Sequence, residues 1–177
     1  MQKRNTQKLL IGKLRIAAKI KQISHKLNRE YADKDLVIVM VLKGSLLLVA
    51  DLIRALRIPY DLEVVQCASY GARGTTRGDL QVIGLERLDI KGRDLLIVDD
   101  IFDSGHTLSS LIHALQEKEP RSIKSLVLLQ KKVAHVTPLR PDYVLFEIDN
   151  HFVIGYGLDY KERFRGLSGI YIYRGDG

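Results

Sequence analysis

The sequence predicts an α/β protein built on a twisted, mainly parallel sheet flanked by helices. Short apolar runs of strand length alternate along the chain with segments whose apolar residues recur at helical spacing. Parallel strands that are covered on both faces have continuous apolar runs of this kind, and helices connect them. The length of 177 residues suits one domain with a full-sized core.

The composition is that of an ordinary soluble globular domain, with 46% apolar and 28% charged residues. No apolar run approaches the roughly 18 residues that span a bilayer, and the first residues lack the apolar centre of a secretory signal. The single cysteine, Cys67, cannot form an internal disulfide, so we expect a reducing, cytoplasmic location. The net charge of +7 favours an anionic partner, either nucleic acid or a polyphosphate substrate.

The first third of the chain predicts a helix followed by a strand–turn–helix unit. Apolar residues from Thr6 to about Glu30 recur at helical spacing and predict an amphipathic helix with a basic outer face. Asp35–Leu42 is a continuous apolar run of strand length. Lys43–Ser45 interrupts it before a helical pattern resumes at Leu46–Leu56, and Ser45 is of a type that caps helices. Ligands of α/β folds bind at such strand ends.

A long hairpin is predicted next. Tyr60–Ala68 and Gly78–Gly84 both have the pattern of strands. The intervening loop, Ser69–Gly78, has three glycines, two arginines and no aliphatic residue larger than alanine. Such a loop cannot pack a core of its own, so we expect a mobile lid over an anionic substrate.

The most informative stretch is Leu95–Leu108, LLIVDDIFDSGHTL. An apolar strand pattern leads through Asp99, Asp100 and Asp103 into the hydroxyl-rich turn Ser104–Thr107, where a helical pattern opens. A strand, a small turn and a helix N-terminus together cradle phosphate, because free backbone N–H groups and the helix dipole face one point. The three carboxylates would repel phosphate, so they are expected to hold sugar hydroxyls, a metal or a developing cation.

The remaining third predicts one helix and then mostly strands and turns, so we expect an appended subregion over the strand ends. The predicted helix is Leu108–Lys118, and the predicted strands are Ser125–Gln130, Asp142–Ile148, Phe152–Tyr156 and Ile170–Tyr173.

These motifs together resemble a known family. Leu95–Leu108 resembles the phosphoribosyl-diphosphate (PRPP) signature of type I phosphoribosyltransferases, and Val41–Ser45 resembles the diphosphate-binding turn of the purine branch. Ser69–Gly71 resembles the start of its catalytic loop, and Lys131 resembles the lysine that recognises the purine 6-oxo group. Pro141–Leu167 resembles the base-binding hood and tail of hypoxanthine/guanine phosphoribosyltransferases.

The resemblance implies a type I phosphoribosyltransferase fold with a small hood and a long flexible hairpin loop. A single domain is expected over residues 1–177, with a core at about 30–135 and a hood formed by the N-terminal segment and about 136–177. The implied reaction joins a 6-oxopurine to PRPP and releases diphosphate, with Mg²⁺ as cofactor. The implied assembly is a homodimer or homotetramer, in the cytoplasm, without nucleic acid or membrane.

The resemblance also implies roles at the sugar and the reacting centre. Asp103 would act as general base at the purine N7, while Tyr70 and Ser69 close over the reaction. Asp99 and Asp100 would hold the ribose hydroxyls. The residues implied for the ribose and 5′-phosphate are Asp99, Asp100, Asp103, Ser104, Gly105, His106 and Thr107, and those implied for Mg²⁺ are Asp99, Asp100 and Asp159.

Roles at the leaving group and the base are implied in the same way. Lys43, Gly44 and Arg165 would bind the diphosphate, at a turn that often contains a non-proline cis peptide in the family. The residues implied for the purine are Lys131, Phe152, Val153 and Asp159.

Two departures leave alternatives open. The family usually has Glu-Asp where this chain has Asp99-Asp100, and Asp149–His151 replaces a commoner Pro-Asp-Lys/Glu beside the base pocket. The preference among hypoxanthine, guanine and xanthine therefore stays open. A phosphoribosyltransferase for adenine or a pyrimidine is an alternative that Lys131 disfavours. A nucleic-acid-binding regulator of the same fold would suit the basic charge, but the chain keeps every matched carboxylate.

Overall fold

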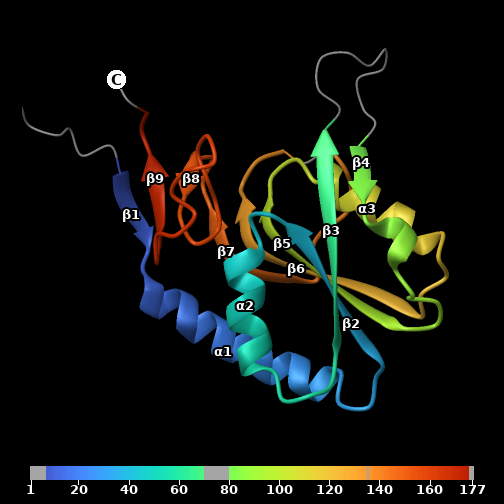
Figure 1. The fold of residues 1–177 in the computed structure, drawn as a ribbon. Helices are drawn as coiled ribbons and strands as arrows, with labels where there is room; N and C mark the ends of the chain where they lie inside the picture. The colour runs from blue at the N-terminus through green and yellow to red at the C-terminus, as the bar shows by residue number, and fades with distance from the viewer. Residues whose placement is uncertain (1–6, 70–79, 135, 176–177) are drawn as a thin grey trace, which may run out of the picture.

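The computed structural model describes residues 7–69, 80–134 and 136–175. Within those ranges it contains two sheets, three α-helices and a short 3₁₀-helix, η1 (Leu85–Arg87) (Figure 1). The larger sheet has six strands, and the smaller sheet has three. In spatial order the six strands are β4 (Leu80–Ile83), β3 (Asp61–Ser69), β2 (Leu36–Leu42), β5 (Asp94–Phe102), β6 (Ser122–Lys131) and β7 (Tyr143–Ile148).

The prediction of a mainly parallel sheet is confirmed. The pairs β3–β2, β2–β5, β5–β6 and β6–β7 are parallel, and only β4 joins antiparallel, as the second arm of the hairpin with β3. The carboxyl ends of the parallel strands therefore meet along one edge, where the turns after β2, β5 and β6 are neighbours.

Helices cover both faces of this sheet. Helices α1 (Lys13–Glu30) and α2 (Leu46–Ala55) pack on one face, and α3 (His106–Gln116) packs on the other (Figure 1). The apolar run of β5 supplies both cores, because successive side chains of a strand point to opposite faces. Leu96 and Val98 join the core under α1 and α2, whereas Leu95 and Ile97 join the core under α3.

The three-stranded sheet forms the hood, which lies beside the carboxyl ends of the central strands (Figure 1). Its order is β1 (Gln7–Ile11), β9 (Ile170–Tyr173) and β8 (Val153–Ile154), and both pairings are antiparallel. The two ends of the chain thus form one sheet. The prediction of a helix from Thr6 is wrong at its start, since Gln7–Ile11 pairs with β9 and the helix begins at Lys13. Only this long-range pairing selects the strand.

Three further expectations need correction. Ser45 precedes α2 but makes no side-chain cap, because its hydroxyl donates to the Val41 carbonyl oxygen (2.6 Å). The predicted strand Phe152–Tyr156 shortens to Val153–Ile154, since Tyr156 and the glycines beside it adopt positive φ. Strand β7 pairs with β6 in the central sheet, although the predicted hood began at about residue 136.

The described helices include none that is long and apolar enough to cross a membrane.

The packing of α3 leads to a stability prediction. Leu111 lies on the inner face of α3 and is fully buried, so Leu111→Ala should lower the free energy of unfolding by about 2–5 kcal/mol through lost contacts and a cavity. His113→Ala, on the exposed face of the same helix, should change it by less than about 0.5 kcal/mol at pH 8. Urea denaturation of both variants measures the difference, and equal losses would contradict the assigned faces of α3.

Candidate active site

The predicted site residues follow the carboxyl ends of adjacent central strands. Strand β2 ends at Leu42 beside β5, which carries Asp99 and Asp100, and β6 ends at Lys131 on the other side of β5. Parallel pairing therefore brings together three turns, after Leu42, Phe102 and Lys131, that are far apart in the chain. This edge is where open α/β sheets bind ligands.

Asp99 and Asp100 form a buried, interacting pair in the last part of β5. Asp99 is only 7% exposed, and its Oδ1 accepts a hydrogen bond from the Asp100 backbone N–H (2.9 Å). Burial, and then the adjacent negative charge of Asp100, raise the pKa of Asp99 well above its ordinary value. Burial also raises the pKa of Asp100, although the positive charge of Arg165 opposes that rise. Positive charge at this position would stabilise both carboxylates.

Gly44 lies directly against the Asp100 carboxylate. A Cβ on Gly44 would be 1.5 Å from Asp100 Oδ2, so no larger residue fits without movement of the strand or turn. The Leu42–Lys43 peptide bond that leads into this turn is cis, as the resemblance implies. On its other side, Gly44 meets the hood, because a Cβ on Gly157 would lie 1.9 Å from the Gly44 carbonyl oxygen. The turn after β2 is therefore held between β5 and the hood.

Arg165 reaches this turn from the hood and is held by three acceptors. Its Nη1 donates to the Gly157 carbonyl oxygen (2.8 Å), and its Nη2 contacts Asp159 Oδ1 (2.9 Å) and Glu162 Oε2 (3.2 Å). Arg165 and Asp159 are both about three-quarters buried at their side chains. Arg165 thus lies near the Gly44 turn through Gly157, its charge acts on Asp100, and Asp159 is paired with it.

Glu162 is a site residue that the sequence analysis missed. Its Oε2 is 3.2 Å from Lys43 Nζ and 3.2 Å from Arg165 Nη2, so one carboxylate bridges the two cations implied for the diphosphate. Hydrogen bonds from Lys43 and then Arg165 hold the pKa of Glu162 below its ordinary value. In sequence Glu162 is one acid in a charged run, and nothing in the run distinguishes it.

The backbone at Glu162 also departs from ordinary preference. Tyr160 and Arg163 exchange both backbone hydrogen bonds (3.1 and 3.0 Å), which closes a two-residue hairpin. Its central residues, Lys161 and Glu162, have φ of 51° and 62°, values that favour Asn-Gly rather than Lys-Glu. Asp159 Oδ2 accepts the Glu162 backbone N–H (2.8 Å), so side-chain contacts help to hold this turn. Such departures concentrate at functional sites.

The predicted phosphate turn has the expected form. Gly105 has φ of 87° and precedes α3, whose first helical hydrogen bond runs from Ser109 N to Gly105 O (3.0 Å). The amides at the start of α3, from His106 and Thr107 on, therefore precede the helical ladder. The Ser104 hydroxyl oxygen accepts the His106 N–H (3.4 Å). The positive end of α3 lies at this turn.

Lys131 and Asp103 meet across the ends of β6 and β5. Lys131 Nζ donates to Asp103 Oδ2 (2.6 Å), with the lysine side chain 13% exposed and the aspartate side chain 51% exposed. A mostly buried ammonium group thus lies beside a more exposed carboxylate. This pair offers a hydrogen-bond donor and an acceptor to one ligand.

The hood contributes an aromatic surface and an open strand edge. Phe152 is 53% exposed. The centroid of its ring lies 5.8 Å from that of Tyr160, in an edge-on arrangement, and 6.2 Å from that of Tyr173, in a tilted one. The Phe152 carbonyl oxygen accepts the Tyr173 N–H (2.9 Å). Val153 pairs with Ile172, the next pair along the two strands. Hydrogen-bonded and non-hydrogen-bonded residue pairs alternate in antiparallel strands, so the N–H and C=O of Val153 point away from β9, to the outer edge of β8.

The predicted loop Ser69–Gly78 is described only at its first residue. Ser69 ends β3, whereas Tyr70 lies outside the described residues, so the roles implied for Ser69 and Tyr70 stay predictions. The described residues contain no group of three or more His, Cys, Asp or Glu that could hold a metal ion. The described protein residues alone would not complete the coordination of a divalent cation here, so substrate and water oxygens would have to supply the other ligands. The donor set suits Mg²⁺, which is commonly held by one or two carboxylates together with substrate phosphates and water.

The fold and the arrangement of this edge define a phosphoribosyltransferase, and the comparisons agree. A family model described as the phosphoribosyl transferase domain matches residues 10–161. The chain is 37% identical over 170 residues to a hypoxanthine-guanine phosphoribosyltransferase of Bacillus subtilis, covering 96% of this chain and 94% of that protein. It is 39% identical over 168 residues to the enzyme of the same name from Mycobacterium avium, covering 92% and 83%.

A solved structure is similar over the whole chain. Trypanosoma cruzi hypoxanthine phosphoribosyltransferase, in complex with its product IMP, has a TM-score of 0.88 at 34% identity and covers 98% of each chain. The chain belongs to the hypoxanthine-guanine phosphoribosyltransferase family. It is a transferase that moves the phosphoribosyl group of PRPP to a purine base in purine salvage.

The contact between Gly44 and Asp100 predicts the effect of a small substitution. Gly44→Ala should reduce kcat/KM for PRPP at least about 100-fold, because the added methyl group displaces either Asp100 or the turn. Gly12→Ala is the matched control: Gly12 has an ordinary φ of −78° and space for a Cβ. Steady-state kinetics measures both variants. Near-normal kcat/KM in Gly44→Ala would contradict a functional role for this contact.

Proposed function

We propose that this enzyme converts hypoxanthine and guanine to IMP and GMP, with release of diphosphate. The observation that best supports a 6-oxopurine is the pair of Lys131 and Asp103, in which a mostly buried donor lies beside an acceptor. A 6-oxopurine presents an acceptor at O6 next to N7, so one base can meet both groups. A nucleic-acid regulator of the same fold is less well supported, because it would need none of these groups.

Base selection would rest on Lys131. An ammonium donor fits a 6-oxo group, whereas a 6-amino group presents a donor in return and leaves the lysine unpaired. Sites built on such hydrogen bonds can reject the mismatched ligand by about 10⁴-fold. The exposed ring of Phe152 would stack on the purine, and the outward N–H and C=O of Val153 would meet its edge.

The sugar would lie over Asp99 and Asp100. Displacement at the anomeric carbon passes through a state with positive charge on the ribose, and groups that stabilise developing charge accelerate such a step. Burial raises the pKa of both carboxyls, and positive charge on the ribose or on a bound cation would favour their ionised forms. The 5′-phosphate would bind the Ser104–Thr107 turn at the start of α3.

The leaving group would lie between the turn after β2 and the hood. We propose that Lys43, the Gly44 backbone and Arg165 bind the diphosphate and that Asp159 orients Arg165. Asp99, Asp100 and Asp159 are the proposed protein contacts for Mg²⁺. When bound, Mg²⁺ would neutralise phosphate and carboxylate charge. Asp103 would take the proton at N7 as the base enters.

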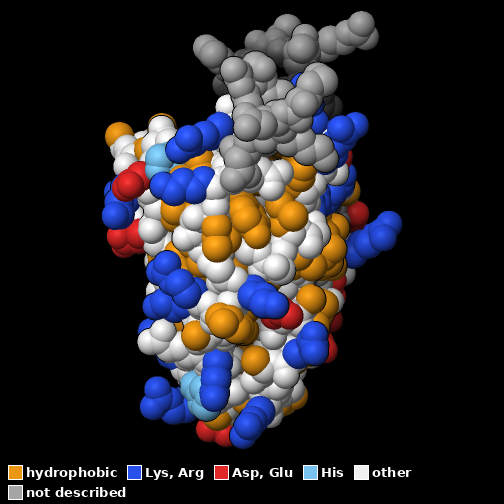
Figure 2. Space-filling model, turned by 90° about the vertical axis from the view of Figure 1, so that its left-hand side faces the viewer, with side chains coloured by type: hydrophobic (Ala, Val, Ile, Leu, Met, Phe, Trp, Pro, Cys, Tyr) orange, Lys and Arg blue, Asp and Glu red, His pale blue; other side chains and the backbone are white. Residues whose placement is uncertain are grey.

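Exposed apolar side chains bear on the assembly of the protein. Large apolar side chains are exposed on β1, α1 and the start of α2, including Leu9, Leu14 and Leu46. Figure 2 shows hydrophobic side chains gathered on one face of the molecule. Exposed apolar patches favour association, so we propose a homodimer or homotetramer. We also propose a cytoplasmic location, no nucleic-acid partner, and a single domain that comprises core and hood.

The proposed function is tested by an assay with each base in turn. The enzyme, PRPP and Mg²⁺ are mixed with hypoxanthine, guanine, xanthine or adenine, and nucleotide formation is followed spectrophotometrically. We expect turnover with hypoxanthine and guanine, none above background with adenine, and loss of activity with excess EDTA. Absence of turnover with both hypoxanthine and guanine would refute the proposal.

Asp103→Asn tests the proposed general base. The variant keeps the shape of the side chain but cannot take a proton, so kcat should fall about 10²–10⁴-fold while the Kd for PRPP changes less than about threefold. Asp33→Asn, at an exposed acid in the turn after α1, is the matched control and should keep normal kcat. A normal kcat in Asp103→Asn would show that proton transfer does not depend on this residue.

Glu162→Gln tests whether the bridging carboxylate competes with diphosphate. Removing its charge leaves Lys43 and Arg165 more available, so the KM for PRPP should fall about two- to fivefold and inhibition by diphosphate should strengthen. Glu117→Gln, an exposed acid at the end of α3, should leave both quantities unchanged. An increase in the KM of Glu162→Gln would instead indicate that Glu162 supports Arg165 in its binding position.

A further inference from the structure

A cavity of about 630 Å³ lies between the carboxyl-terminal halves of α1 and α2. Four basic side chains and one imidazole line it, from Lys21, His25, Arg29, Arg54 and Arg57, and no acidic residue is among the lining residues. We call this cavity the basic pocket. It belongs to no part of the proposed catalytic site.

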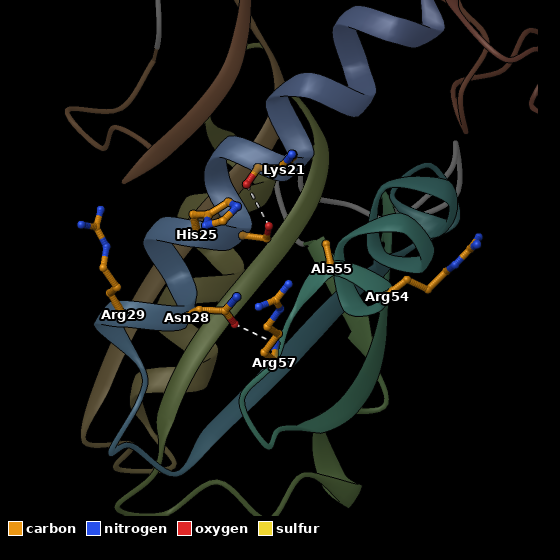
Figure 3. A pocket seen from close by; sticks show the side chains of 8 residues that line it. Lys21, His25, Asn28, Arg29, Arg54, Ala55 and Arg57 are labelled. Carbon is orange, nitrogen blue, oxygen red and sulfur yellow. Dashed lines mark hydrogen bonds between the residues drawn. The ribbon is translucent and has the colours of Figure 1, made fainter.

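The basic pocket has walls that the fold holds in place. Figure 3 shows the Arg57 guanidinium in the space between α1 and the end of α2, with His25 and Asn28 on the α1 side. Arg29 and Arg54 extend outward at its rim. The Arg57 backbone N–H donates to Asn28 Oδ1 (2.8 Å), which ties the segment after α2 to α1. The basic side chains that line the pocket therefore come from two helices and one connecting segment.

The positive charge of the basic pocket is poorly balanced. Within the part of the chain that the structure describes, Arg54 has one distant carboxylate partner, Asp51 at 3.9 Å. The described ion pairs include no carboxylate with Lys21, Arg29 or Arg57. Like charges that line one pocket repel one another, and an anion bound there would offset that repulsion.

The lining selects a class of anion. Guanidinium and ammonium groups are the side chains that best recognise phosphate oxygens. The cavity has the volume of a small-ligand site and is larger than a single phosphate ion needs. No aromatic side chain lines it, so it lacks the stacking surface with which proteins bind single-stranded nucleic acid. We propose that the basic pocket binds a small polyphosphate anion with two or more linked phosphate groups.

The basic pocket is separate from the proposed diphosphate site. Helix α2 begins just after Gly44 and ends beside the pocket at Ala55. Ten helical residues span about 15 Å, so one anion cannot occupy both places. Polyphosphate is nevertheless expected to bind the active site as well, and the experiment must report on the pocket itself.

Inorganic tripolyphosphate is the probe, titrated into the whole wild-type protein at pH 8. Calorimetry should show a second class of tripolyphosphate-binding site in addition to the active site. The NMR signals of the His25 imidazole should shift as this second site fills and stop shifting when it is saturated. Arg57→Ala should weaken this class at least about tenfold, the value expected for loss of one charge-assisted contact. The paired change Lys21→Ala and His25→Ala should weaken it similarly, and alanine preserves the helix α1.

Lys19→Ala is the matched control, because it removes one charge from α1 outside the basic pocket. It should leave the affinity of the pocket unchanged, and thermal unfolding of each variant without ligand checks that it folds. Three results would overturn the proposal: His25 signals that do not move in the wild type, an equal loss of affinity in Lys19→Ala, or tighter binding of a single-stranded RNA oligonucleotide than of tripolyphosphate at this site. Normal kcat in the pocket variants, with the binding loss, supports a separate site.

Discussion

The contact on which the proposed site depends is the close approach of the Gly44 backbone to the Asp100 carboxylate. It brings the turn after β2 onto the end of β5, where a side chain of any size would hold the two apart. Gly157 presses on the same turn from the hood. Three segments that are distant in sequence thus meet at one backbone position. Glycine at positions 44 and 157 is what allows the turn after β2, the end of β5 and the hood to touch.

Charged side chains make the other main contacts at this edge of the sheet. Burial raises the pKa of both Asp99 and Asp100, so a nearby positive charge would stabilise their ionised forms. Nearby, Lys43 and Arg165 share the carboxylate of Glu162. The protein therefore holds acids that a cation would stabilise and cations that are paired with acids of the same chain. A substrate that carries phosphate, with Mg²⁺, complements both, and this arrangement supports the proposed reaction.

Two kinds of basic surface can be distinguished in this chain. At the proposed catalytic site, Lys131 is paired with Asp103 and Arg165 with Asp159. At the basic pocket, Arg57 has no such partner among the described ion pairs, although its backbone is fixed by Asn28. The overall charge of +7 could not separate these cases, because it does not say which cations lie beside acids. Their spatial pairing gives the two surfaces different expected ligands.

The sequence by itself determined the fold class, the order of the central elements and the family, because apolar runs, helical spacing and the Leu95–Leu108 motif are local properties. It also placed the carboxylates, Lys131 and the Gly44 turn in candidate roles. Only the tertiary structure decided that Gln7–Ile11 is a strand, that Ser45 does not cap α2 and that Glu162 bridges Lys43 and Arg165. Each of these depends on a partner that the local pattern does not name. The role of a strand edge, a hydroxyl or a carboxylate depends on the group that folding places next to it. That group is in position only when the sheets have formed.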